Sequence, residues 1–142
     1  SPTTPTGDKA TTTPYGNLDP TFDICELAMG AGATFVARTS AYHAVETQSF
    51  IKQGLEHKGF ALIEVISACP VIYGKLNKKG DASKMMRQMK ENIIPVKSFE
   101  ALTENERENK LKRGIFRKEI KPEYTAVYDK LIDSLKPEDG EK

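Results

Sequence analysis

The stretch FALIEVISACPVIYG, residues Phe60–Gly74, decides the fold predicted for this chain. Its first seven residues are apolar apart from Glu64, and several are β-branched, which is typical of a strand covered on both faces. Pro70 has no backbone N–H and therefore marks the point where the chain leaves the sheet. Cys69 then lies just beyond the carboxyl end of that strand. This is the edge at which open α/β sheets bind ligands.

The preceding residues predict the rest of a strand–helix–strand unit. TFVA at residues 34–37 predicts a short strand, and residues 43–58 predict a helix. One face of that helix is expected to carry Ala44, Gln48, Ile51 and Leu55, with Phe50 beside it. His57 fits its last turn, where positive charge is favourable, and Gly59 fits a left-handed cap. This order of elements predicts two parallel strands joined by a crossover helix.

A helix is also expected before the first strand. Asp19 is a good N-cap residue, and Pro20 suits the first helical position. The apolar stripe that follows consists of Ile24, Leu27, Ala28 and Ala31. Cys25 lies beside this stripe and is interpreted as a small core residue. A helix here implies a further strand upstream, but the proline- and threonine-rich residues 1–18 predict only a loop. Composition favours a free, flexible arm, and the alternative is a loop that crosses the floor of a site. The predicted sheet is therefore incomplete, and the start at Ser1 without Met favours a fragment.

Downstream of Gly74 the sequence becomes strongly basic. Lysine and arginine side chains recur between residues 75 and 90, and Asp81 predicts the cap of a helix that runs to about Ile93. Two interpretations of these cations stay open: a solvated helix face, or a docking surface for an acidic partner. Further along, Thr103 and Glu106 have the spacing of a capping box.

The last part of the chain predicts a strand, a helix and a tail. Residues 114–120 alternate well enough for an edge strand. Pro122 opens a helix whose apolar stripe consists of Tyr124, Val127, Tyr128 and Leu131. Residues 136–142 are expected to be a charged, frayed tail.

Composition excludes several classes of function. The 142 residues suggest one domain, and a net charge of +1 gives no footprint for nucleic acid. A mean hydropathy of -0.50 without a long apolar run argues against a membrane span, so no membrane partner is expected. The first residues lack the features of a secretory signal. Two cysteines form no disulfide framework, so a reducing, cytoplasmic location is predicted.

The residues alone assemble no complete catalytic site, and no catalytic residue is assigned. Cys69 supports three interpretations: a buried structural thiol at a strand end, a reactive nucleophile, or one ligand of an iron–sulfur cluster whose other thiolates lie elsewhere. His43 and Tyr42 lie at the strand-to-helix corner, where a histidine is more often a structural hydrogen-bonding residue.

Six segments carry a family resemblance: SPTTPTG, TTPYGN, AGATFVAR, AYH, HKGF and EVISACPVIYG. In this order they resemble the C-terminal half of the β subunit of 2-oxoacid:ferredoxin oxidoreductases, the thiamine diphosphate-binding subunit, and in particular the 2-oxoglutarate type. The resemblance implies an α/β fold, the parallel-sheet portion of a thiamine diphosphate-binding fold with a helical C-terminal extension. On this basis residues 1–77 belong to the cofactor-binding domain and residues 78–142 to the extension.

The resemblance also implies an activity, namely CoA-dependent oxidative decarboxylation of a 2-oxoacid with electron transfer to ferredoxin. The cofactors would be thiamine diphosphate, Mg2+ and a [4Fe-4S] cluster, and the partner would be the α subunit. Cys69 occupies the position of a cluster ligand in the family. Thr3 and Thr4 belong to a loop that resembles the one following the thiamine diphosphate and magnesium segment.

The family's magnesium-binding GDG segment, its TGGQ run and its other three cluster cysteines would all precede Ser1. The isolated chain is therefore expected to be inactive and to bind neither cofactor. The alternative function is a non-catalytic α/β interaction or assembly domain in which Cys69 is only structural. Self-association through the open sheet edge is a further expectation.

Overall fold

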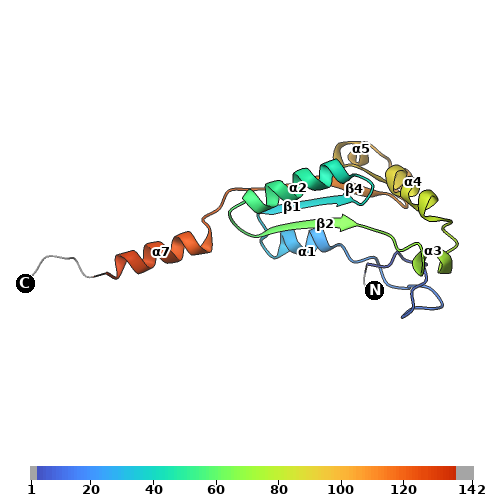
Figure 1. Ribbon diagram of the computed structural model, residues 1–142, viewed down its shortest axis with the longest axis horizontal. Coiled ribbons are helices and arrows are strands. Elements are labelled where there is room, and N and C mark those ends of the chain that lie inside the picture. The colour runs from blue at the N-terminus through green and yellow to red at the C-terminus, as the bar shows by residue number, and fades with distance from the viewer. Residues whose placement is uncertain (1–2, 137–142) are drawn as a thin grey trace, which may run out of the picture.

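The computed structural model describes residues 3–136. A four-stranded sheet in the order β2-β1-β4-β3 lies at its centre (Figure 1). The strands are β1 (Phe35–Ser40), β2 (Ala61–Ile66), β3 (Ile93–Pro95) and β4 (Leu111–Lys118). The helices are α1 (Ile24–Gly30), α2 (Ala44–Glu56), α3 (Tyr73–Leu76), α4 (Ala82–Asn92), α5 (Val96–Glu100), α6 (Glu104–Arg107) and α7 (Tyr124–Ser134). The predicted α/β class is confirmed.

The predicted strand–helix–strand unit is present as β1, α2 and β2. β1 and β2 are parallel, with Phe35 opposite Ala61 and Ser40 opposite Ile66. β1 is longer than predicted, and all six of its residues are buried. α1 and α2 cover opposite faces of the sheet (Figure 1). Val36 packs with the α1 side chains, whereas Phe35 packs with Phe50 of α2.

The expectation that the strand after Phe60 is covered on both faces is wrong. β2 is an edge strand of the described sheet, and its residues are only half-buried, apart from Val65, which is exposed. The doubly covered strand is β1 instead. An apolar run indicates a strand, but it does not tell how much of each face its neighbours cover.

The first helix begins later than Asp19 and Pro20 suggest. The observed N-cap is Asp23, whose carboxylate accepts a hydrogen bond of 3.0 Å from the Glu26 N–H. The Asp19 carbonyl accepts instead from Thr6 and Asn17, which holds this segment in the preceding loop.

The predicted apolar face of α1 is also only partly correct. The helix buries Cys25 and Ala28, whereas Leu27 of the predicted stripe is 57% exposed. The expected core role of Cys25 is confirmed, since this residue is only 1% exposed. The helix therefore starts later than predicted, and its buried face includes Cys25.

The predicted inner face of α2 is wrong. Ile51 and Leu55 are exposed, and the buried residue is Phe50. The helix approaches the sheet closely at Gly54, where an added Cβ would lie 2.6 Å from the Ile63 side chain. Glycine adds no apolar side chain to the sequence pattern, so the helix face that contacts the sheet through Gly54 does not show as an apolar stripe. The hydrophobic periodicity instead points to a face that is exposed to solvent.

The prediction of an edge strand at residues 114–120 is wrong in its position. β4 lies between β1 and β3, antiparallel to β1 and parallel to β3. The short strand β3 was not predicted. A strand from the predicted C-terminal extension thus joins the sheet of β1, and the domain boundary near residue 77 stays a prediction.

Two predicted helix starts are confirmed. Asp81 caps α4 by accepting from the Lys84 N–H at 2.7 Å. Thr103 and Glu106 form the expected capping box of α6. α4 buries Met85 and Met89.

The last helix, α7, extends away from the sheet (Figure 1), and none of its residues is buried. The predicted stripe exists but faces solvent, with Tyr124 at 76% and Leu131 at 53% exposure. The tail predicted at residues 136–142 lies outside the described residues apart from Lys136. In the part of the chain that the structure covers, no helix has the length and apolar character needed to cross a bilayer.

Candidate functional site

The carboxyl ends of β1 and β2 meet at one edge of the sheet. The Ala41 N–H donates to the Ile66 carbonyl at 2.9 Å, which keeps the two strands paired up to this edge. The segment containing Cys69 leaves β2 there, and His43 follows β1 at the same edge. The predicted carboxyl-edge position of Cys69 is therefore confirmed by the fold.

Cys69 is a free, exposed cysteine. The backbone N–H groups of Ile72, Val71 and Tyr73 face its sulfur and lower the pKa of the thiol. Hydrogen bonds from amide groups stabilise the thiolate, the form that attacks electrophiles and binds metals. The interpretation of Cys69 as a buried structural thiol is contradicted by its exposure.

The chain beyond Cys69 is held by close packing. The Gly74 N–H donates to the Cys69 carbonyl at 2.9 Å, which closes the turn. Gly74 is buried, and an added Cβ would lie 2.7 Å from the sulfur of Met85. α4 therefore packs directly against the segment that presents the thiol.

The N-terminal loop is fixed to the same segment. The Tyr73 hydroxyl donates to the Asp8 carboxylate, and the Lys79 ammonium lies 3.0 Å from the same carboxylate. The Asn77 side chain accepts from the Lys9 N–H at 2.7 Å and donates to the Lys9 carbonyl at 2.9 Å. Burial and the Asp8 carboxylate raise the pKa of Tyr73. The opening loop is therefore docked on the helix that follows Cys69, rather than a free arm.

The predicted loop residues Thr3 and Thr4 lie at the start of this docked segment. Thr4 is buried, and its carbonyl accepts a hydrogen bond of 2.8 Å from the Asn17 side chain. The adjoining backbone is tied by a bond of 2.7 Å from the Gly7 N–H to the Asn17 carbonyl. Asn17 thus orders the loop, a role that the sequence did not indicate.

A second polar cluster lies at the carboxyl end of β1. His43 Nδ1 is 2.7 Å from the Ser40 hydroxyl, and the Thr39 hydroxyl donates to Glu46 at 3.1 Å. Glu46 also forms an ion pair with Arg113 of β4. Burial and the nearby Arg113 charge lower the pKa of His43, so the neutral imidazole is favoured. This agrees with the predicted structural role of His43.

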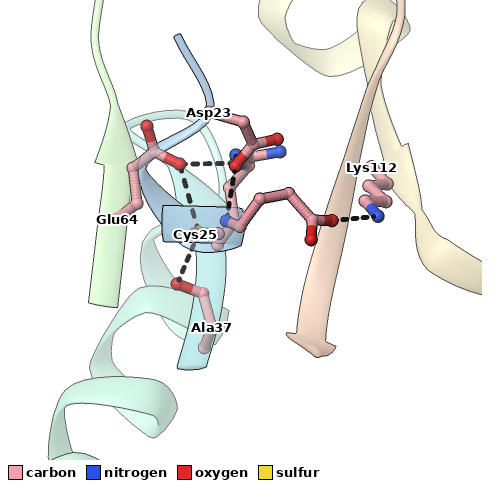
Figure 2. A network of polar contacts seen from close by, with 7 residues as sticks. Asp23, Cys25, Ala37, Glu64 and Lys112 are labelled. Carbon is pink, nitrogen blue, oxygen red and sulfur yellow. Dashed lines mark hydrogen bonds and ion pairs between the residues drawn. The ribbon is translucent and has the colours of Figure 1, made fainter. Parts of the chain in front are cut away.

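A buried ionic network lies beneath this edge (Figure 2). Arg38 of β1 contacts Asp23 at 2.6 Å and Glu64 of β2 at 2.5 Å, and the Cys25 thiol donates to Glu64 at 3.3 Å. Burial and the neighbouring carboxylates raise the pKa of Cys25 to about 12 despite Arg38. The network joins α1, β1 and β2. Its sequence signal was Glu64, the only charged residue of an otherwise apolar strand.

His57 has a different role from the capping surface residue predicted. Its Nε2 lies 2.7 Å from the Thr34 hydroxyl, and its ring packs against Phe35 at a centroid distance of 5.6 Å. The residue therefore fastens the end of α2 to the start of β1. Gly59 has a positive φ of 134°, but the predicted left-handed cap is wrong, because α2 ends at Glu56 and its C-cap is His57.

Within residues 3–136, no group of three or more His, Cys, Asp or Glu side chains is arranged to hold a metal ion. Cys69 can therefore supply one thiolate to a metal centre, and further ligands would have to come from elsewhere. The site is a single activated thiol beside an ordered loop, at the edge of the sheet that suits a cofactor.

Comparison with known proteins adds to this geometry. Residues 1–65 match the family model of the thiamine pyrophosphate enzyme, C-terminal TPP binding domain. The chain is 44% identical over 138 residues to 2-oxoglutarate synthase subunit KorB of Methanocaldococcus jannaschii, an alignment covering 97% of this chain and 51% of that protein. Along nearly its whole length the chain is therefore similar to one half of a 2-oxoglutarate synthase subunit KorB. The recognition made from the sequence segments is thereby confirmed.

One further relative and one solved structure extend this comparison. The KorB subunit of Methanothermobacter marburgensis is 38% identical over 140 residues, which cover 99% of this chain and 48% of that protein. A solved 2-oxoglutarate:ferredoxin oxidoreductase from Magnetococcus marinus, with 2-oxoglutarate, coenzyme A and succinyl-CoA bound, has a TM-score of 0.75 at 23% identity. That likeness covers 100% of this chain and 49% of the solved chain, and it shows the fold. The chain spans about half the length of the curated relatives it matches.

Proposed function

We propose that this chain is part of the β subunit of a 2-oxoacid:ferredoxin oxidoreductase acting on 2-oxoglutarate. The reaction is oxidative decarboxylation with coenzyme A, which yields the acyl-CoA and delivers two electrons to ferredoxin. The observation that carries the proposal is the similarity to KorB along nearly the whole chain, with an activated thiol at the carboxyl edge of the sheet. In this proposal the complete enzyme also contains an α subunit and works in the reducing cytoplasm.

Cys69 is proposed as one thiolate ligand of a [4Fe-4S] cluster. Its exposure leaves the sulfur accessible to iron, and the three backbone N–H groups lower the charge that the sulfur must carry. Hydrogen bonds to cluster sulfurs also influence the reduction potential. Since Cys25 is buried and bound to Glu64, the remaining ligands must come from outside the described residues.

Thiamine diphosphate, which stabilises a carbanion during decarboxylation, is proposed to bind beside the N-terminal loop. The family match over residues 1–65 includes this loop, and Thr3 and Thr4 are the proposed contacts. What the chain contributes is an ordered backbone, since Asn17 and Asp8 hold the loop in place. The Mg2+ that would bind the diphosphate needs oxygen ligands, which we expect from the other half of the subunit.

The basic residues after Cys69 are proposed as the docking surface for an acidic ferredoxin. Lys79 is already paired with Asp8, so Lys75 and Lys78 are the better candidates for contact with a partner. Opposite charge accelerates association, most strongly at low salt. We expect Lys75→Glu with Lys78→Glu to slow ferredoxin reduction about tenfold at low ionic strength. Reversal of Lys52 on α2 together with Lys58, which follows that helix, should leave the rate unchanged. If both double variants reduce ferredoxin at the same rate, the basic residues after Cys69 are a solvated surface and not a docking surface.

The test of the main proposal is anaerobic iron and acid-labile sulfide analysis with a visible spectrum. The chain is measured alone and after fusion to the part of the Methanocaldococcus jannaschii KorB relative that it does not match. We expect the fusion, but not the chain alone, to hold a cluster and thiamine diphosphate. A fusion that folds yet remains colourless and cofactor-free would favour the alternative of an α/β interaction or assembly domain.

Cys69→Ser tests the ligand in the same fusion, with Cys25→Ala as the matched control. We expect Cys69→Ser to lose or convert the cluster while thiamine diphosphate still binds. Cys25→Ala should retain the iron. Unchanged iron content and spectrum in Cys69→Ser would contradict the ligand assignment and leave the family assignment intact.

A further inference from the structure

Tyr73 connects the turn at Cys69 with the N-terminal loop, which lies beside α3 (Figure 1). Its backbone N–H faces the Cys69 sulfur, whereas its hydroxyl donates to the Asp8 carboxylate, 65 residues away in the sequence. The Lys79 ammonium lies 3.0 Å from the same carboxylate and 5.9 Å from the centre of the Tyr73 ring. Asp8 is therefore held by two groups of the segment that follows Cys69.

Asn77 makes a second link, and its partner is the backbone of the loop. The side-chain oxygen accepts from the Lys9 N–H at 2.7 Å, and the side-chain nitrogen donates to the Lys9 carbonyl at 2.9 Å. The same nitrogen donates to the Tyr73 carbonyl at 2.9 Å. Because both polar groups of one backbone residue are bound, this contact fixes the orientation of the loop as well as its distance from α3.

Hydrogen bonds continue from these contact points to the start of the loop. The Asn17 N–H donates to the Asp8 carbonyl at 2.8 Å, and the Asp8 N–H donates to the Pro5 carbonyl at 3.1 Å. The Asn17 side chain donates to the Thr4 carbonyl at 2.8 Å. A continuous series of bonds thus runs from the Cys69 turn to Thr4. Contiguous contacts of this kind can couple two sites.

Regular secondary structure does not hold the loop in place. Within the described residues, the segment before α1 contains no helix and one isolated bridge, between Ala10 and Thr13. Its geometry therefore depends on side-chain contacts such as those of Asn17, Tyr73 and Asn77. α3 is also short, with four residues. Two segments that are each weakly structured are thus ordered by contact with one another.

We propose that Tyr73 and Asn77 are positioning residues that lock the N-terminal loop to the Cys69 turn, so that a ligand bound by the loop is felt at Cys69. The inference rests on the proposed function, in which the loop contacts thiamine diphosphate and Cys69 binds the cluster. The two links then hold the two cofactor sites in a fixed relative position. Positioning matters because a displacement of about 1 Å at a reacting group can cost about 100-fold in rate.

The links are tested first on the 142-residue chain by hydrogen exchange measured with mass spectrometry. Asn77→Ala removes both bonds to the Lys9 backbone. We expect the backbone amides of residues 4–17 and of residues 71–74 to exchange at least ~10-fold faster, because each segment loses a contact that keeps it closed. Faster exchange confined to the residues next to position 77 would overturn the proposal.

Two further variants accompany this measurement. Tyr73→Phe removes the other link and should accelerate exchange in the same two segments. The matched control is Gln53→Ala, which removes a hydrogen bond of 2.9 Å from Lys118 elsewhere on the molecule. The control should leave exchange in both segments unchanged. A control that accelerates them as much as Asn77→Ala would show a general loss of stability and would overturn the specific link.

The functional consequence is tested in the fusion to the part of the KorB relative that this chain does not match. In wild type with Mg2+, added thiamine diphosphate should slow exchange in residues 4–17 and in residues 71–74. It should also alter the electron paramagnetic resonance spectrum of the dithionite-reduced cluster. In Asn77→Ala, at equal iron content and saturating thiamine diphosphate, the loop should still respond, whereas residues 71–74 and the spectrum should not.

The positioning role and the proposed function fail in different ways. A fusion that binds neither thiamine diphosphate nor a cluster would refute the proposed function, and the positioning role with it. A fusion that holds both cofactors, and in which Asn77→Ala still transmits the response to the cluster, would refute the positioning role alone. The two cofactor sites would then be coupled without the contacts of Asn77 to the loop.

Discussion

The two cysteines of this chain lie in opposite environments. Cys25 is buried under the sheet and donates to Glu64, and burial raises its pKa to about 12. Cys69 is exposed beyond the carboxyl end of β2, where the N–H of Ile72 and two neighbouring amides lower its pKa. The same side chain is therefore an inert core group in one place and an activated thiol in the other.

Position in the fold, rather than residue type, determines the chemistry of each cysteine. Cys25 lies in α1 against a buried strand, where the thiol is a small hydrophobic group with one acceptor. Cys69 lies in a turn whose backbone N–H groups are directed at the sulfur.

The largest contrast is expected in thiol reactivity. With iodoacetamide at pH 8, Cys69 should be alkylated at least ~1000-fold faster than Cys25, because the thiolate is the nucleophile and Cys25 is both protonated and buried. Peptide mass spectrometry over a time course measures both rates, with the urea-unfolded chain as the control in which they become similar. The Cys69 rate should also reach half its maximum at a lower pH than a cysteine in a short peptide. Comparable alkylation rates for Cys25 and Cys69 in the folded chain would contradict the difference between their environments.

The network around Cys25 should make a large contribution to stability. Arg38→Met leaves the carboxylates of Asp23 and Glu64 without their partner, and we expect the free energy of unfolding to fall by about 3–5 kcal/mol. Urea denaturation measures the change. The control is Lys112→Met, which removes a solvent-exposed pair with Glu26 at 3.1 Å and should cost less than about 1 kcal/mol. Equal losses in the two variants would show that burial of the pair is unimportant.

A smaller, pH-dependent effect is expected for Asp23. Burial opposes its ionisation, but the Glu26 N–H and Arg38 outweigh burial and lower the pKa of the carboxyl group. A lowered folded pKa stabilises the fold above the unfolded pKa, near 4, and this stability is lost as the pH falls through the folded value. Relative to wild type, Asp23→Asn should therefore be less stable by roughly 1 kcal/mol at pH 7, with the gap closing below about pH 3. Unfolding measured across this pH range checks the trend, which a constant gap would contradict.

The smallest effect is expected where the N-terminal loop meets the Cys69 segment. Tyr73→Phe removes the hydroxyl that donates to Asp8, and it should lower the free energy of unfolding by about 1 kcal/mol. Cleavage within residues 3–19 by a protease should become faster. Tyr15→Phe is the control, since Tyr15 is 98% exposed and its change should alter neither quantity. An unaltered cleavage rate in Tyr73→Phe would mean that other contacts hold the loop.

Local sequence predicts one part of the candidate site but not the rest. The position of Cys69 beyond a strand followed from an apolar run that ends at Pro70, both local signals. The partners that order the site, Asn77 for Lys9 and Arg113 for Glu46, come from distant parts of the chain. A side chain gives no local sign of which distant group will be folded against it.

Local sequence patterns were enough to predict the α/β class, the parallel pair β1 and β2, the caps at Asp81 and Thr103, and the resemblance to the KorB subunits. These features depend on short-range patterns: apolar runs, capping residues and ordered segments. The folded structure was needed to show that β1 rather than β2 is fully covered, that β4 lies inside the sheet, and that α2 buries the face containing Gly54. Burial depends on neighbours contributed by the whole chain, whereas strand and helix formation depend mainly on nearby residues.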